Sequence, residues 1–159
     1  MRVKVKFVND KAKELYLAAS NGESVFPFKA HGRDFCYDVV ATSRKEIAPN
    51  VYKYGIGLAF QVYRDPDFSL TRVSIDLRPR SSVWKTGMVL SNCAGTIDEG
   101  YTGEVSAVFY HLFPDMPIYE VGDRIGQIKI GTALPMDFVE VDELDDTDRG
   151  AGGYGSTGK

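Results

Sequence analysis

The chain has 159 residues, of which 43% are hydrophobic and 26% charged, and its formal net charge at pH 7 is -3. This length suits one domain with a sizeable core, and the slightly acidic balance provides no basic field for binding nucleic acid. No stretch approaches the ~20 apolar residues of a membrane span, and no signal-peptide apolar region is recognisable. We therefore expect a cytoplasmic protein with neither membrane nor nucleic-acid partners.

Short strands dominate the predicted elements. In the first of them, Val3, Val5 and Phe7 alternate with lysines, which is the period of a half-buried strand. A short helix is predicted over residues 11–20. Four apolar, β-rich runs follow, separated by turn-forming residues: VYKYGIGLAFQVY, TRVSIDLRP, GEVSAVFYHLF and RIGQIKIG. This pattern predicts an all-β domain built as a sandwich or a barrel.

Cysteine and histidine chemistry has little basis in this sequence. Cys36 and Cys93 lie far apart and lack metal-ligand spacing, so we interpret both as free thiols. His31 and His111 are isolated, which favours neither a two-His metal site nor a Ser-His nucleophile. Any chemistry is therefore expected to use carboxylates or an added metal ion.

The composition changes abruptly towards the C-terminus. Residues 137–148 carry seven acids without a Lys or Arg, which is typical of a solvated strand edge or connector. The last twelve residues, DRGAGGYGSTGK, include five glycines. We therefore divide the chain into a β domain, residues 1–145, and a flexible Gly-rich arm, residues 146–159.

Four further stretches are unusual for plain scaffold. AHGRDF contains Asp34, and RPRSSVWKTG places Arg80 and two serines before a predicted helical turn, where amides and hydroxyls can hold an anion. NCAGTIDEGYTGEV surrounds Asp98 and Tyr101 with glycines and predicts a β-hairpin with tight turns. GDRIGQIKI places Gln127 on a strand. Each stretch taken alone also fits an ordinary turn or strand.

Taken in order, these four stretches and the arm resemble the five motifs of the trimeric dUTP pyrophosphatases (dUTPases). The resemblance runs from about residue 30 to residue 159, and the arm matches the most specific motif, Arg-Gly-x-Gly-Gly-aromatic-Gly-Ser-Thr-Gly, throughout. It implies a jelly-roll-like distorted β-barrel of the β-clip type, forming a homotrimer with three active sites at subunit interfaces. The implied reaction is Mg²⁺-assisted hydrolysis of dUTP to dUMP and pyrophosphate, which limits uracil incorporation into DNA and supplies dUMP for dTTP synthesis.

The resemblance also implies roles for single residues. Asp98 would be the catalytic carboxylate that activates the water attacking the α-phosphate, and Asp34 would reach Mg²⁺ through a coordinated water. Tyr101 would pack on the deoxyribose and leave no space for a 2′-hydroxyl. In the arm, Arg149 would clamp the γ-phosphate and Tyr154 would cover the uracil, so the arm is predicted to close as a lid. The implied substrate-binding residues are Arg80, Ser81, Ser82, Asn92, Gly95, Ile97, Tyr101, Gln127, Arg149, Tyr154, Gly155, Ser156 and Thr157.

The chain departs from the family pattern at three places. The loop before the second motif, within residues 61–77, is longer than usual, Ser82 stands where many members have Gly, and Gly100 where many have Asp. The last two features also suit dCTP deaminase, an enzyme on the same fold. That enzyme needs a glutamate on the strand after the third motif, where this chain has Val108, and it lacks the full arm.

A second alternative is a non-catalytic, nucleotide-binding regulatory trimer. A pure binder would not need Asp98, Asp34 and the arm together. The sequence therefore favours the hydrolase over both alternatives.

Overall fold

The computed structural model describes residues 2–63 and 72–153. This part of the chain contains ten β-strands, one α-helix, α1 (Lys11–Ala19), and one short 3₁₀-helix, η2 (Ser81–Lys85). The predicted all-β class is confirmed, and α1 is the short helix expected from the sequence. The strands are β1 (Arg2–Phe7), β2 (Tyr37–Val40), β3 (Ser43–Ala48), β4 (Val51–Gly55), β5 (Leu58–Tyr63), β6 (Arg72–Arg78), β7 (Met88–Leu90), β8 (Gly95–Asp98), β9 (Ser106–His111) and β10 (Arg124–Ala133).

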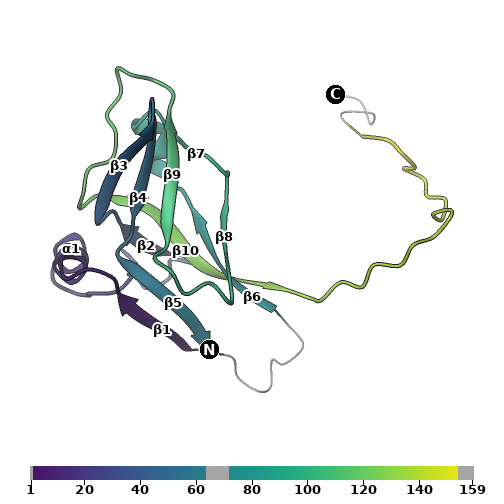
Figure 1. Cartoon of the computed structure of the whole chain (residues 1–159), viewed down its shortest axis with the longest axis horizontal. Coiled ribbons are helices and arrows are strands. Elements are labelled where there is room, and N and C mark those ends of the chain that lie inside the picture. The colour runs from purple at the N-terminus through teal and green to yellow at the C-terminus, as the bar shows by residue number, and fades with distance from the viewer. Residues whose placement is uncertain (1, 64–71, 154–159) are drawn as a thin grey trace.

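The strands form three antiparallel sheets (Figure 1). Sheet I contains β1 and β5, sheet II has the order β2-β10-β6-β8, and sheet III has the order β3-β4-β9-β7. Apolar side chains of sheets II and III share one core, with Ile75 and Leu77 from the former and Tyr54 and Phe109 from the latter. In the described residues the sheets do not close into a barrel, so the expected distorted barrel is present as open sheets packed on a common core.

Alternation in the sequence accounts for β1. Its apolar residues lie opposite those of β5, with Val3 across from Val62 and Val5 across from Phe60. Residues facing each other across an antiparallel pair point to the same side, so these side chains form one apolar face. The N-terminal strand predicted from the sequence is therefore confirmed.

The segment around Asp98 does not form the predicted β-hairpin. β8 pairs with β6 in sheet II, whereas β9 pairs with β4 and β7 in sheet III. The chain turns after β8, where the Tyr101 N–H donates to the Asp98 carbonyl at 2.9 Å. Val105 then exchanges backbone hydrogen bonds with the β4–β5 connection and joins the opposite sheet. The turn was correctly predicted, but it connects two sheets instead of two paired strands.

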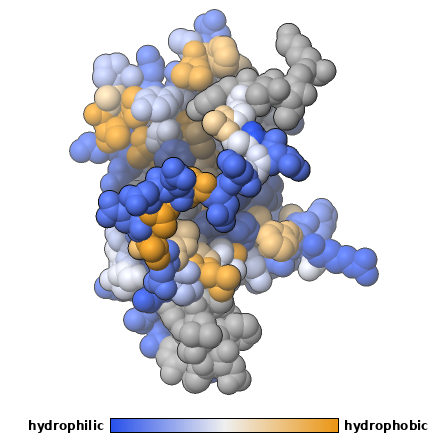
Figure 2. Space-filling view, turned by 90° about the vertical axis from the view of Figure 1, so that its right-hand side faces the viewer, coloured by the Kyte–Doolittle hydropathy of each residue, from blue (hydrophilic) through white to orange (hydrophobic). Residues whose placement is uncertain are grey.

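Beyond β10, the chain leaves the body as an extended arm (Figure 1). Its apolar side chains are highly exposed: 72% for Leu134, 89% for Phe138 and 87% for Leu144. On the side of the molecule to which the arm extends, hydrophobic residues lie among hydrophilic ones (Figure 2). The sequence division placed residues 134–145 in the β domain, whereas here they lie outside all three sheets.

Candidate functional site

A cavity of about 320 Å³ opens where β8 and β9 diverge into different sheets. Asn92, Gly95, Ile97, Asp98 and Tyr101, all predicted from the sequence as site residues, lie together in its lining. The complete lining consists of Leu77, Ser91, Asn92, Gly95, Thr96, Ile97, Asp98, Tyr101, Val105, Ser106, Ala107 and Val108. The structure thus gathers the predicted uracil, sugar and catalytic residues at one cavity.

Asp98 ends β8, and its side chain is exposed. Within the part of the chain that the structure describes, no hydrogen bond or ion pair engages its carboxylate. Its backbone is nevertheless held, because Asp98 lies opposite Ser74 on β6 and its carbonyl accepts the Tyr101 N–H. A carboxylate on a fixed backbone with open lone pairs is suited to accept a proton from water.

The part of the cavity lining next to Asp98 contains groups that can hydrogen-bond to a planar polar ligand. Gly95 is buried, and a Cβ at this position would lie 3.6 Å from the Asn92 amide nitrogen. The turn between them contains Cys93 at a φ of 57°. A side-chain amide in a lining that includes the apolar residues Leu77 and Ile97 is the usual composition of a small-molecule pocket.

A second polar cluster surrounds Asp38 on β2, a residue that the sequence reasoning did not select. Asp38 is only 3% exposed. Its Oδ1 accepts hydrogen bonds from Arg80 Nε at 3.1 Å and Gln127 Nε2 at 3.0 Å, and its Oδ2 accepts from Arg124 Nη1 at 3.1 Å. A buried carboxylate requires such partners, because leaving it unpaired away from water costs several kcal/mol.

This cluster carries more positive than negative charge. Two guanidinium groups, Arg80 and Arg124, share the single carboxylate of Asp38, and each retains N–H donors beyond those that Asp38 uses. Ser81 and Ser82 follow Arg80 directly at the start of η2, with Ser81 exposed and Ser82 half-buried. The cluster therefore has the charge and the donors to hold an anion such as a phosphate.

Asp34, the predicted metal residue, lies in the loop before β2. Its Oδ2 accepts the His31 N–H at 2.9 Å, and its N–H donates to the His31 carbonyl. No hydrogen bond or ion pair joins Asp34 to Arg80 or Gln127 in the described ranges. The sequence signal that would have identified Asp38 is an acid within the otherwise apolar run Tyr37–Ala41.

The residues present fit a magnesium ion that is held mainly by a ligand. Within residues 2–63 and 72–153, no three His, Cys, Asp or Glu side chains lie together as protein ligands for a metal. Both oxygens of Asp38 are occupied, whereas Asp34 Oδ1 has no hydrogen-bond partner among the described residues. Mg²⁺ commonly binds through phosphate oxygens, waters and only one or two carboxylates, so one such carboxylate is sufficient.

The cavity and the Asp38 cluster are well separated within one chain. On β6, Arg78 lies opposite Gln127 and Ser74 lies opposite Asp98. Four residues along β6 and two strand spacings across the sheet place the Cα atoms of Gln127 and Asp98 about 16 Å apart. The two halves of the predicted site therefore lie on opposite sides of β6, four residues apart along it.

The arm residues are only partly described. Arg149 Nε donates to the Gly152 carbonyl at 2.9 Å, which closes a local turn in the arm. Tyr154, Gly155, Ser156 and Thr157 lie outside the described residues.

No helix in the described ranges has the length and apolar character that spanning a bilayer requires.

Comparison with known proteins places these features in one family. A model of the dUTPase family matches residues 29–158. The deoxyuridine 5′-triphosphate nucleotidohydrolase of Corynebacterium glutamicum is 40% identical over 140 residues, covering 86% of this chain and 89% of that protein. The protein of the same name from Nautilia profundicola is 33% identical over 161 residues, covering 100% of both.

The fold agrees with this sequence relationship. The dUTPase of Staphylococcus bacteriophage 80alpha, solved with dUPNHPP, has a TM-score of 0.75 and 21% identity and covers 99% of each chain. At this identity the likeness bears on the fold alone. Because the family model spans most of the sequence and the two bacterial relatives cover most or all of it, the chain belongs to the dUTPase family.

Proposed function

We propose that this protein hydrolyses dUTP to dUMP and pyrophosphate, limiting uracil incorporation into DNA and supplying dUMP for dTTP synthesis. The observation that carries the proposal is the cavity in which Asp98, Tyr101 and the Asn92 amide converge. The family match and the names of the bacterial relatives support the same activity.

The chemistry assigns one task to each of these groups. Asp98 accepts a proton from a water molecule, which attacks the α-phosphorus in line with the leaving pyrophosphate. Asn92 and the backbone at Gly95 and Ile97 bind the uracil edge. Tyr101 lies where the sugar packs and excludes a 2′-hydroxyl by collision. The water oxygen ends on dUMP, and the broken bond is the one between the α-phosphorus and its bridging oxygen.

Two observations support hydrolysis over deamination in this cavity. Val108, at the position where the deaminase needs a glutamate, lines the cavity and cannot transfer a proton. The carboxylate of Glu104 is used elsewhere, because its Oε1 accepts the Gly57 N–H at 2.9 Å. Hydrolysis is therefore the reaction that the lining favours.

The active site is proposed to form between subunits of a homotrimer. The phosphate-binding candidates Arg80, Ser81, Ser82 and Gln127 gather about Asp38, some 16 Å from Asp98 by the strand register. The described lining of the cavity beside Asp98 contains no Arg or Lys that could hold the phosphates of a triphosphate. A second copy that brings its Asp38 cluster to this cavity would complete the site.

The arm is the second feature that favours assembly. In the run from Val139 to Asp142, apolar and acidic residues alternate, whereas β1 alternates valines with Lys4 and Lys6. Among the described residues no strand pairs with the other edge of β1, which suits this edge to strand addition. We propose that the arm of one subunit adds to β1 of a neighbour, pairing acids with lysines.

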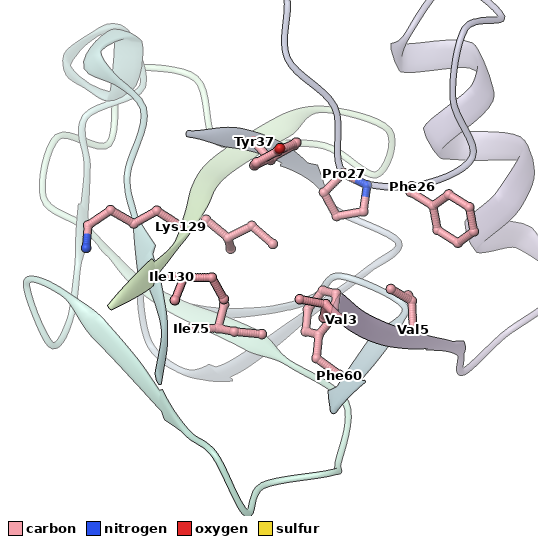
Figure 3. Close-up of a pocket in the computed structure, with 10 residues that line it drawn as sticks. Val3, Val5, Phe26, Pro27, Tyr37, Phe60, Ile75, Lys129 and Ile130 are labelled. Carbon is pink, nitrogen blue, oxygen red and sulfur yellow. The ribbon is translucent and has the colours of Figure 1, made fainter. Parts of the chain in front are cut away.

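A groove beside β1 would receive the apolar side chains of such an arm. It has a volume of about 490 Å³ and lies between sheets I and II (Figure 3). Its lining is largely apolar: Val3, Val5, Phe26, Pro27, Tyr37, Phe60, Ile75, Ile128, Lys129 and Ile130. Side chains of an added strand that face the same side as Val3 and Val5 would enter this groove.

The rest of the arm is proposed to close over the bound triphosphate. Arg149, followed by Tyr154, Ser156 and Thr157, would then contact the phosphates and the base. Mg²⁺ held by the phosphate oxygens, with Asp34 reaching it through water, would neutralise their negative charge. Arg80 and Gln127 orient the outer phosphates.

The decisive experiment measures pyrophosphate release from dUTP, dTTP, dCTP, dATP, dGTP and UTP, with Mg²⁺ and with EDTA. Ammonia release from dCTP is followed in parallel, and sedimentation gives the oligomeric state. We expect Mg²⁺-dependent release from dUTP alone, by a trimer. Ammonia release would support the deaminase, and nucleotide binding without turnover would support the regulatory trimer.

A further inference from the structure

Two hydrogen bonds hold Tyr101, one through its backbone and one through its side-chain hydroxyl. Its backbone N–H donates to the Asp98 carbonyl at 2.9 Å, and its hydroxyl donates to the Glu104 carbonyl at 2.9 Å. The side chain is 48% exposed and lines the cavity, so packing alone does not immobilise it. The hydroxyl bond therefore selects one ring position from those that an exposed tyrosine can adopt.

Gly103 provides the space that this ring position requires. A Cβ at Gly103 would lie 2.6 Å from Tyr101 Oη and 2.8 Å from Tyr101 Cζ, closer than non-bonded atoms approach each other. The φ angle of Gly103 is not positive, so a left-handed backbone conformation does not explain the glycine. The sequence attributes this glycine to a tight turn, whereas in the structure the Tyr101 ring accounts for it.

Glu104 links the ring to a rigid part of the fold. While its carbonyl accepts the Tyr101 hydroxyl, its side-chain Oε1 accepts the Gly57 N–H at 2.9 Å in the β4–β5 connection. The next residue, Val105, donates to the Leu58 carbonyl and accepts from the Ile56 N–H. These bonds thus fix the position of the Tyr101 ring relative to the β4–β5 connection, which joins sheet III to sheet I.

We propose that Gly103 and the Glu104 carbonyl are positioning groups that hold the Tyr101 ring at the sugar end of the cavity. They thereby set how strictly the enzyme separates deoxyribonucleotides from ribonucleotides. This inference rests on the proposed dUTP hydrolysis and on the place that it gives to Tyr101. Neither group contacts the reacting atoms; both act through the ring.

A single methyl group tests this arrangement. In Gly103→Ala, the new Cβ would collide with the far end of a flexible side chain, so the ring should move and the fold should persist. The displaced hydroxyl loses its bond to Glu104. We expect the ratio of kcat/KM for dUTP to that for UTP to fall about tenfold, the usual effect of one altered contact in a specificity pocket.

Gly100→Ala is the matched control in the same segment. Gly100 also lacks a positive φ, and a Cβ there meets nothing within 4 Å among the described residues. This variant should keep the wild-type ratio and melting temperature. Tyr101→Phe, which removes the hydroxyl but keeps the ring, should lower the ratio by a smaller factor than Gly103→Ala, because the phenyl ring still fills the space.

The measurement is kcat and KM for dUTP and UTP in all three variants and in Tyr101→Ala, with thermal melting of each. A purely structural role for Gly103 would lower both efficiencies together and leave their ratio unchanged, which would overturn the inference. If Tyr101→Ala lowers the ratio and Gly103→Ala does not, the positioning role fails while the proposed function stands. Wild-type protein without dUTP hydrolysis would instead contradict the proposed function itself.

Discussion

Asp98 is the residue on which the proposed chemistry depends most. Asp98→Asn is nearly isosteric but removes the proton acceptor, so kcat for dUTP should fall about 10²- to 10⁴-fold. Affinity for a non-hydrolysable dUTP analogue should survive, because the side chain is exposed and the backbone turn is unaffected. Single-turnover kinetics and calorimetry check both expectations. Near-normal turnover by Asp98→Asn would contradict the assignment of Asp98 as the proton acceptor.

Two acids close in sequence are expected to have different roles: Asp38 in stability and substrate binding, and Asp34 in the dependence of the rate on Mg²⁺. Asp38→Asn would leave Arg80 and Arg124 facing a neutral amide, so we expect a loss of roughly 1–3 kcal/mol of stability. KM for dUTP should also rise, because Arg80 loses its orienting partner. Asp34→Asn should melt like the wild type and raise the Mg²⁺ concentration needed for half-maximal rate. Melting curves and Mg²⁺ titrations separate the two, and equal melting would contradict the Asp38 assignment.

Residues of the candidate site differ in how far the sequence predicts their place in the structure. Asn92, Asp98 and Tyr101 line one cavity, because they belong to one short segment whose turn brings them together. Their roles stay predictions. Asp38 was missed, because burial and the approach of Arg124 from β10 depend on contacts between distant parts of the chain. The apolar run around Asp38 indicates a buried strand, but it does not indicate which partners the carboxylate meets there.

Among the elements, the ion pair between β6 and β10 should make stability depend on pH. Lys129 Nζ donates to Asp76 Oδ2 at 2.8 Å, and this bond, with a second from Ser74, lowers the pKa of Asp76 below its usual value. Because the folded pKa lies below the unfolded one, the stabilisation is present above about pH 4 and is lost as the pH falls through the folded pKa.

We therefore expect Asp76→Asn to lower the melting temperature at pH 7, and the difference from wild type to shrink below about pH 4. Melting curves between pH 7 and pH 2.5 measure this. Asp115→Asn, at an exposed loop acid, serves as the control and should follow the wild type throughout. A constant difference across this range would show that the Asp76–Lys129 pair does not contribute through its charge.

Strand existence and strand pairing differ in how far the sequence determines them. β1 was predicted from alternation, which is a local property, and its register against β5 follows from matching apolar faces. The assignment of β8 and β9 to different sheets is not local: it depends on β8 pairing with β6 and on Val105 bonding to the β4–β5 connection. Glycine and turn signals mark where the chain bends, but they do not specify which strand it joins next.

At the scale of the whole molecule, two features of one subunit favour association with another subunit: the separation of the two parts of its site and the exposed arm. The Cα atoms of Asp98 at its cavity and of Gln127 in its Asp38 cluster are about 16 Å apart by the strand register, and its arm carries apolar residues away from its own core. In the proposed trimer, a neighbouring subunit would supply the phosphate cluster and a strand edge. The trimer implied by the sequence resemblance remains a prediction with this physical basis.

Charge reversal along the proposed contact between the arm and β1 tests that basis. Lys4→Glu with Lys6→Glu places acids on β1 opposite the acidic arm, and like charges across paired strands are destabilising. We expect this variant to dissociate at protein concentrations where the wild type stays trimeric, and to lose dUTP hydrolysis in parallel. Sedimentation over a dilution series and pyrophosphate release provide the two measurements.

The complementary change, Glu140→Lys with Asp142→Lys, should weaken assembly in the same way when made alone. Combined in one chain with the β1 changes, it restores opposite charges across the contact, and both the trimer and the activity should return. A deletion of residues 149–159 should behave differently: it leaves the proposed strand contact intact, so the trimer should persist while hydrolysis falls with the loss of Arg149. If the combined variant stays dissociated while each subunit melts like the wild type, the arm does not pair with β1 and the apolar groove must have another occupant.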